Sequence, residues 1–174
     1  RYPHHNGARG FQPIKKGVPT VTGVLREAGY FNGILGKTRH LAPAVQFAWD
    51  VKVEKTRHGT GRAPKRYYEE VVCFPKAANA RKQPLFLMPN PHDPHRPFAG
   101  SQQEHNKAKR GKEEFPPASR YYKPKEVTVP GFLPDLPQVR KELAQYFTSV
   151  HRCDETVGEI LRALKESGME DNTV

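Results

Sequence analysis

The chain has 174 residues, of which 36% are hydrophobic, and 29 Lys and Arg against 18 Asp and Glu give it a net charge of +11. This length suits one domain better than two, and no apolar stretch is long enough to span a membrane. The 14 Gly and 17 Pro indicate long loops around a modest core. The two cysteines, Cys73 and Cys153, are too few for a disulfide scaffold, and their apolar neighbours predict buried free thiols.

The excess of positive charge favours polyanionic partners, such as nucleic acid, anionic lipid or a sulfated or phosphorylated polymer. An alternative is that acidic parts of a longer protein balance this charge. The chain begins at Arg1 with no Met and no visible signal peptide. We therefore expect that an upstream portion is absent.

The first predicted elements form a helix, a tight turn and a strand, an order typical of α/β layers. Apolar residues at helical spacing follow Thr20 and Thr22, either of which could be the N-cap, and Gly29 ends the helix. Residues 31–35 then read as a strand. A second helix over 66–81, which Pro75 kinks or splits, precedes a strand at 85–88 whose continuous apolar run is expected of a strand buried on both faces.

The second half of the chain begins with a polar, Pro-rich surface excursion over 97–130. A long helix follows, because apolar residues keep helical spacing from Val139 to Leu164, and Gly168 is its C-cap. Residues 171–174 read as the start of another strand.

Two basic clusters follow two of the predicted strands, and ligands of open α/β sheets bind at the carboxyl ends of strands. The first cluster contains Lys37 and His40, and the second contains His92, His95 and Arg96. Together they predict a site for a tetrahedral oxyanion, with lysine as a point charge and histidine as a titratable donor.

Each cluster has a simpler alternative. Lys37 and His40 could belong to a solvated loop, and Asp93 could cap a turn or orient a histidine. Two histidines three residues apart could bind a metal, but no third ligand of suitable spacing is evident. The pair Tyr121-Tyr122 could stack on a sugar or a base, or pack within its loop.

Several segments resemble the sulfatase family. The opening Tyr-Pro-His-His-Asn-Gly resembles the segment just downstream of the signature Cys-x-Pro-Ser-Arg, and residues 17–37 resemble the helix and strand that carry the family's active-site lysine. His-Asp-Pro-His-Arg at 92–96 and Val-Pro-Gly-Phe-Leu-Pro-Asp at 129–135 are similar to the heparan N-sulfatase (sulfamidase) branch, as is the long helix that follows.

This resemblance implies an α/β fold, part of an alkaline-phosphatase-like sandwich with a mostly parallel sheet flanked by helices. It also implies a formylglycine nucleophile made from a Cys or Ser, and a calcium ion. Lys37 would contact the sulfate and help hold the nucleophile, and His40 would lie beside the formylglycine hydroxyls. His95 would contact the sulfate and serve the leaving group, while His92 and Arg96 shape the turn or bind substrate.

The sequence departs from the family pattern in two ways. The family has Lys-x-His, whereas Lys37 and His40 are three residues apart, so either a one-residue insertion keeps the imidazole in place or His40 has moved out. Neither the signature nor the expected metal-binding Asp residues occur in the 174 residues. We therefore expect residues 1–174 to be a partial catalytic domain, with the nucleophile and the calcium ligands outside this chain.

The resemblance predicts hydrolysis of sulfate esters or sulfamates, acting on sulfated sugars in a periplasmic, secreted or lysosomal location, with no nucleic-acid partner. The first alternative is a phosphonate or phosphodiester hydrolase of the same superfamily. The second is a non-catalytic basic module that binds polyanions. Substrate, oligomeric state and the origin of the nucleophile stay open at this point.

Overall fold

The computed structural model describes residues 5, 12–111 and 114–174. The opening segment that resembles the sequence after the signature therefore lies mostly outside the described residues. The helices are α1 Val21–Glu27, α2 Pro64–Ala80, α3 Gln102–Lys109 and α4 Pro137–Glu166. Short 3-10 turns are η2 Thr38–His40, η3 Ala44–Gln46, η4 Lys55–His58, η5 Pro124–Glu126 and η6 Glu170–Asn172.

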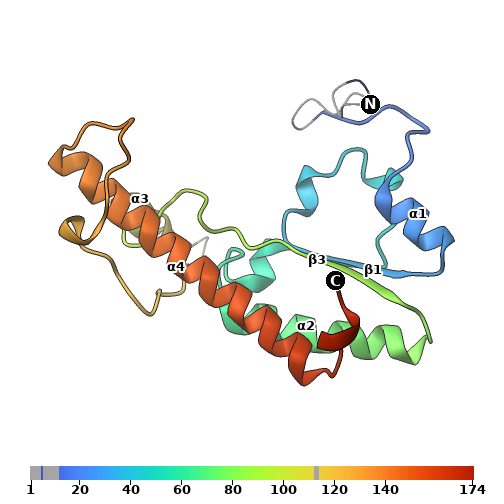
Figure 1. Cartoon of the computed structure of the whole chain (residues 1–174). Helices are drawn as coiled ribbons and strands as arrows, with labels where there is room; N and C mark the ends of the chain where they lie inside the picture. Colours follow the sequence, from blue (N-terminus) through green and yellow to red (C-terminus); the bar gives the residue numbers. More distant parts are fainter. Residues whose placement is uncertain (1–4, 6–11, 112–113) are drawn as a thin grey trace.

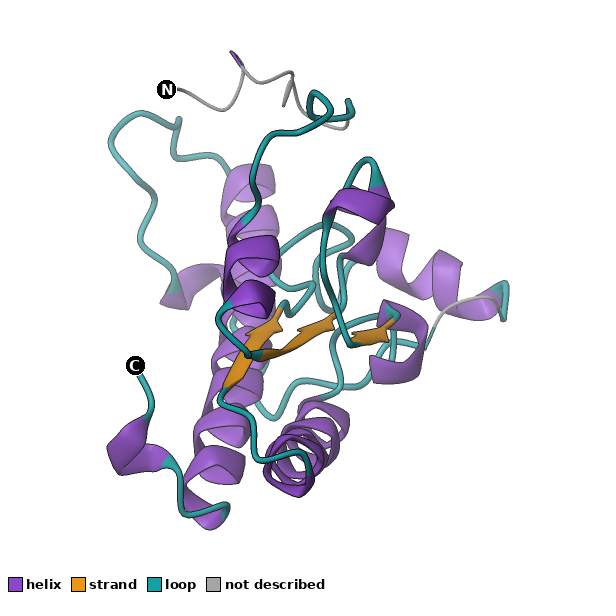
Figure 2. Ribbon diagram, turned by 90° about the vertical axis from the view of Figure 1, so that its right-hand side faces the viewer, coloured by secondary structure: helices purple, strands orange, loops and turns teal. Residues whose placement is uncertain are grey.

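A three-stranded parallel sheet lies at the centre, in the order β2-β1-β3. The strands are β1 Phe31–Leu35, β2 Val51–Val53 and β3 Leu85–Pro89. Helix α1 lies on one face of the sheet, and α2 with α4 lies on the other (Figures 1 and 2). The predicted α/β class is confirmed, and parallel pairing places the carboxyl ends of all three strands at one edge.

Local sequence signals set the bounds of the first elements. Thr20 is the N-cap of α1, and its Oγ1 accepts a hydrogen bond from the Gly23 amide at 3.2 Å. Gly29, which follows the helix at φ +86°, provides the left-handed residue that ends it. Strand β1 is buried along its whole length, whereas β3 is only partly buried, so the expectation that β3 is covered on both faces is wrong.

Helix α2 covers the sheet with Tyr67, Val71, Phe74 and Ala78, all buried. The helix continues through Pro75, which the sequence predicted to kink or split it. A β-carbon at Gly33 of β1 would lie 2.3 Å from Cε2 of Phe74. Glycine at position 33 therefore allows the helix to approach the sheet this closely.

Helix α4 packs along α2 (Figure 1), but with a different face from the one its apolar spacing predicts. Its buried residues are mostly small or polar: Ala144, Thr148, Ser149, Arg152, Thr156 and Ala163. Several residues of the predicted stripe are instead exposed, among them Tyr146, Val150, Val157 and Leu161. Small side chains allow the two helices to approach closely, and this packing outweighs the apolar periodicity.

Other predictions need correction as well. The 97–130 segment contains α3 and η5 and buries Ala99, Ala118 and Val127, so it is more than a surface excursion. The end of the chain forms η6 rather than the start of a strand. Both cysteines are free, as predicted, but Cys73 is exposed.

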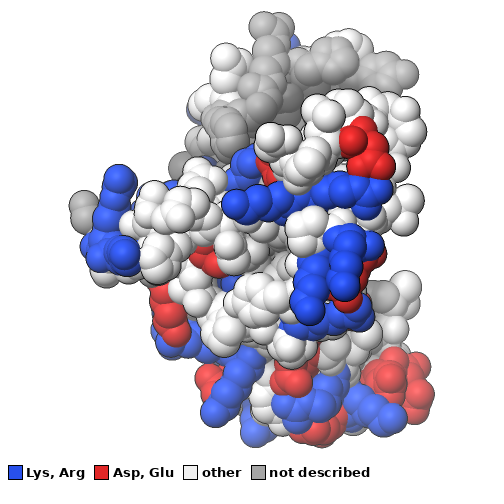
Figure 3. Space-filling model, turned by 90° about the vertical axis from the view of Figure 1, so that its left-hand side faces the viewer, with Lys and Arg blue, Asp and Glu red and all other residues white. Residues whose placement is uncertain are grey.

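The charge on one face of the molecule is mixed in sign. Figure 3 shows one face on which Lys and Arg alternate with Asp and Glu rather than forming a patch of a single sign. Over the described ranges, none of the helices is both long and apolar enough to cross a membrane.

Candidate functional site at the strand ends

The chain turns sharply after β1. Gly36 has φ +75°, and a β-carbon there would lie 2.7 Å from the carbonyl oxygen of Asn90, just beyond β3. Lys37 follows in the left-handed region at φ +51°. The His40 amide donates to the Lys37 carbonyl at 3.1 Å, so a 3-10 turn accommodates the three-residue spacing. His40 and Lys37 therefore belong to one tight turn, and both are exposed.

The second cluster is a turn just after β3, which is tied to the loop before α2. The His92 amide donates to the Gly61 carbonyl at 2.7 Å, and the His95 amide donates to the His92 carbonyl at 3.0 Å. The two imidazole rings are tilted by 34° to each other, with their centroids 4.7 Å apart. Nδ1 of His95 lies 2.6 Å from the Arg96 carbonyl oxygen, which can only accept, so Nδ1 carries a proton.

The turns that carry the two predicted clusters lie side by side, because Gly36 directly approaches the Asn90 carbonyl oxygen. Burial, together with the charges of Arg62, Lys55, His95 and Lys37, lowers the pKa of His92 to about 3. His92 is therefore neutral near pH 7, and its ring packs against that of His95 rather than acting as a cation. We call Lys37, Lys55, His92 and His95 the strand-end cluster.

Arg96 is held away from this cluster. Its Nη2 binds the Glu142 carboxylate of α4, and its guanidinium lies 4.5 Å from the centroid of the Phe98 ring. In the predicted pair at 121–122, Tyr122 packs against Phe147 and His151 of α4, in agreement with the loop-packing alternative.

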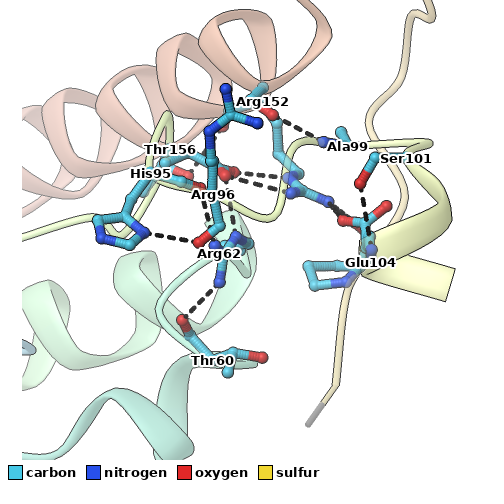
Figure 4. A network of polar contacts seen from close by, with 12 residues as sticks. Thr60, Arg62, His95, Arg96, Ala99, Ser101, Glu104, Arg152 and Thr156 are labelled. Carbon is cyan, nitrogen blue, oxygen red and sulfur yellow. Dashed lines mark hydrogen bonds and ion pairs between the residues drawn. The ribbon is translucent and has the colours of Figure 1, made fainter. Parts of the chain in front are cut away.

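A buried ionic group lies behind the turn. Asp93 accepts hydrogen bonds from Nε of Arg62 at 2.9 Å and from Nε of Arg152 at 2.6 Å, and all three side chains are 0–1% exposed. Arg152 also binds Glu104 of α3 at 3.1 Å. Figure 4 shows Arg62 and Arg152 approaching from different elements, with Glu104 beside Arg152. We call Arg62, Asp93, Glu104 and Arg152 the Asp93 cluster.

This arrangement corrects the interpretation of Asp93, whose carboxylate binds two arginines instead of a histidine ring. Burial lowers the pKa of Arg62, and the charge of Asp93 opposes that shift. Burial also acts to lower the pKa of Arg152, but the hydrogen bonds and charges of Asp93 and Glu104 outweigh it, so the pKa of Arg152 is raised. Both guanidinium groups therefore stay charged, and the two arginines balance the two carboxylates.

A third histidine, His58, is the last residue of η4, which follows β2, and its ring stacks on Tyr67 with ring centroids 4.5 Å apart. Burial is the main reason that its pKa falls to about 4. Protonation therefore favours the unfolded chain, and the stability present above pH 6.5 is lost as the pH falls toward 4. We expect His58→Phe, which keeps a ring but cannot titrate, to reduce the loss of stability between pH 7 and pH 5 by about 1 kcal/mol.

Urea unfolding of both proteins at pH 7 and pH 5 measures this difference. A His58→Phe variant that loses as much stability as the wild type on acidification would contradict the assignment.

The resemblance implies a calcium ion, which would need oxygen ligands. Within the described ranges, no three His, Cys, Asp or Glu side chains are grouped to hold a metal ion. Calcium requires several oxygen ligands, but Asp93 is occupied by two arginines and Glu54 accepts from Thr38. These residues therefore do not fit a calcium ion.

Three comparisons place the chain among known proteins. The sulfatase family model matches residues 1–174. Human N-sulphoglucosamine sulphohydrolase is 30% identical over 183 residues, covering 99% of this chain and 36% of the human protein. Ps i-CgsB, solved in complex with k-i-k-neocarrahexaose, has a TM-score of 0.59 at 20% identity over 99% of this chain and 44% of that chain.

The likeness to Ps i-CgsB shows a shared fold. The identity with the human protein supports placing this chain in the sulfamidase branch. The chain spans about a third of that relative's length. Because the family model matches it from end to end, this chain belongs to the sulfatase family.

Proposed function

We propose that this chain provides the sulfate-binding edge of a hydrolase that cleaves sulfate esters or sulfamates on sulfated sugars. The observation that carries the proposal is the strand-end cluster, in which Lys37 and the His92–His95 pair from separate strands lie together at one edge of the sheet. The preorganised charge of Lys37 and a hydrogen-bond donor on His95 can stabilise charge that develops on oxygen, and each such contact contributes about 3 kcal/mol to lowering the barrier.

Lys37 and His95 have different roles in this proposal. Lys37 supplies a point charge to the sulfuryl oxygens from a turn fixed by the close approach of Gly36 to Asn90. Nδ1–H of His95 donates to the Arg96 carbonyl, so Nε2 is the nitrogen that can face the substrate. When the ring is charged, Nε2–H can protonate the leaving oxygen or nitrogen, and the neutral ring can take a proton back.

The nucleophile is proposed to lie in a segment outside these 174 residues, and His40 is proposed to lie beside it. A formylglycine there would supply covalent catalysis, which separates sulfuryl transfer from release. Calcium ligands are likewise proposed to come from outside this chain.

The proposed substrate is an N-sulfated glucosamine at the end of a sugar chain. The name of the human relative, N-sulphoglucosamine sulphohydrolase, supports this choice. The net charge of +11 also suits an anionic sugar, because it increases the rate of encounter at low salt.

A substrate panel tests the proposal. The parent protein, in which this chain is joined to the nucleophile segment, is assayed on N-sulfated glucosamine, 6-O-sulfated glucosamine, an aryl sulfate and an aryl phosphonate ester. We expect N-sulfated glucosamine to be preferred, and we expect the 174-residue chain alone to be inactive because the nucleophile is proposed to lie outside it.

The other outcomes separate the alternatives. Preference for an O-sulfated substrate or the aryl sulfate would remove the sulfamidase proposal, and preference for the phosphonate would favour the superfamily alternative. Salt-dependent binding of DNA with no turnover on any substrate would favour the polyanion-binding module. Turnover by the chain alone would contradict the placement of the nucleophile outside it.

A further inference from the structure

The Asp93 cluster joins four parts of the chain that are far apart in the sequence. Arg62 lies just before α2, Asp93 follows β3, Glu104 is on α3 and Arg152 is in the middle of α4. The Asp93 carboxylate accepts three hydrogen bonds from the two arginines, and Nη1 of Arg152 also donates to the Pro116 carbonyl at 2.6 Å.

Arg62 contacts the turn of the strand-end cluster at two points. Its Nε binds the Asp93 side chain, while its Nη2 donates to the His95 carbonyl at 3.0 Å. The neighbouring Gly61 carbonyl accepts from the His92 amide. The backbone is thus fixed at His92 and His95, Asp93 is held through its carboxylate, and the imidazole of His95 is fixed by the Arg96 carbonyl.

Stability alone does not account for such a cluster. Removing four charged groups from water costs several kcal/mol for each ion, and well-packed apolar side chains of similar volume stabilise a fold at least as well. Apolar side chains cannot, however, donate to the carbonyl of His95 or bind two sides of one carboxylate. The two guanidinium groups therefore contribute directional hydrogen bonds, which fix the orientation of the Asp93 carboxylate and of the His95 carbonyl.

We propose that Arg62 and Arg152 are positioning residues, which act through Asp93 to hold His95 in the orientation that serves the leaving group. This inference rests on the function proposed above. Neither arginine touches the substrate, and their contribution is to keep the reacting nitrogen within the narrow range of positions that catalysis requires.

Charge-conserving variants test the proposal. Arg62→Lys and Arg152→Lys keep the positive charge but lose the planar fork that binds several acceptors at once. In the parent protein, we expect each variant to lower kcat about 10-fold or more and to change KM less than about threefold, because substrate contacts are retained. Kinetics are measured at a temperature at which circular dichroism shows both variants to be folded.

Two control variants separate positioning from general stability. Arg162→Lys changes an exposed arginine on α4 that binds Glu159 and Glu166. Phe74→Leu weakens the core cluster beside Phe31, at the other end of β1. Both controls should keep the wild-type kcat. A kcat for the arginine variants no lower than that of Phe74→Leu, or a change in KM alone, would overturn the proposal.

A second measurement does not depend on turnover. NMR of the 174-residue chain follows the ring nitrogens of its histidines, and in Arg62→Lys we expect the Nδ1 signal of His95 to shift while that of His151 stays in place. If the wild-type parent hydrolyses none of the panel substrates, the proposed function fails, and this experiment still tests the positioning. Superimposable His95 signals in the wild type and Arg62→Lys would overturn it.

Discussion

Replacing Asp93 by alanine is expected to lower the free energy of unfolding by about 3–5 kcal/mol, because it leaves two buried arginines without their shared partner. Both guanidinium groups are 0–1% exposed, so water cannot replace the lost carboxylate without opening the structure. A loss of this size is a large part of the 5–15 kcal/mol that stabilises a typical domain. Urea unfolding followed by circular dichroism measures it.

An exposed carboxylate provides the control for this experiment. Asp135 binds Arg140 near the start of α4, and its side chain is 58% exposed. We expect Asp135→Ala to leave the unfolding midpoint almost unchanged, as is usual for surface ion pairs. If both substitutions lower the free energy of unfolding by the same small amount, Asp93 does not hold the two buried arginines in the way proposed.

The second large effect is expected at His95. In the parent protein, His95→Ala should lower kcat by about 100-fold or more, because the role proposed for His95 combines a proton donor with a contact to the sulfuryl group. Lys37→Ala should have a similar effect. His92→Ala should do less, because burial and the nearby positive charges keep His92 neutral near pH 7.

The matched control is His105→Ala, since His105 is exposed on α3. Its kcat should equal that of the wild type. If His95→Ala and His92→Ala both have mild effects of the same size, the turn at 92–95 is structural and the role proposed for His95 is wrong.

Local signals made the first half of the fold predictable. A threonine cap and a glycine stop predicted α1, and the short segment after that glycine predicted β1, because capping and chain turns depend on neighbouring residues. The positions of Lys37 and His95 at the carboxyl edge followed from the same reasoning.

Contacts between distant residues were not predictable in this way. Asp93 and Arg152 are 59 residues apart, and no periodicity links them. Apolar spacing also indicated the wrong face of α4. The signal that was missed is the set of small and polar residues at positions 144, 148, 152 and 156, whose four-residue spacing places Arg152 on one buried face.

Lys55 and Arg62 were missed for a related reason. They lie in the loop and turn between β2 and α2, where no motif distinguishes them from other basic residues. Their charges lie near His92 only in the folded chain, where they lower its pKa.

The central claim is that the strand-end cluster binds the sulfuryl group. A crystal structure of the parent protein with the product sulfate bound tests it most directly. We expect sulfate oxygens within hydrogen-bonding distance of Nζ of Lys37 and Nε2 of His95. Sulfate bound elsewhere in the catalytic domain, with no contact to Lys37 or His95, would contradict it.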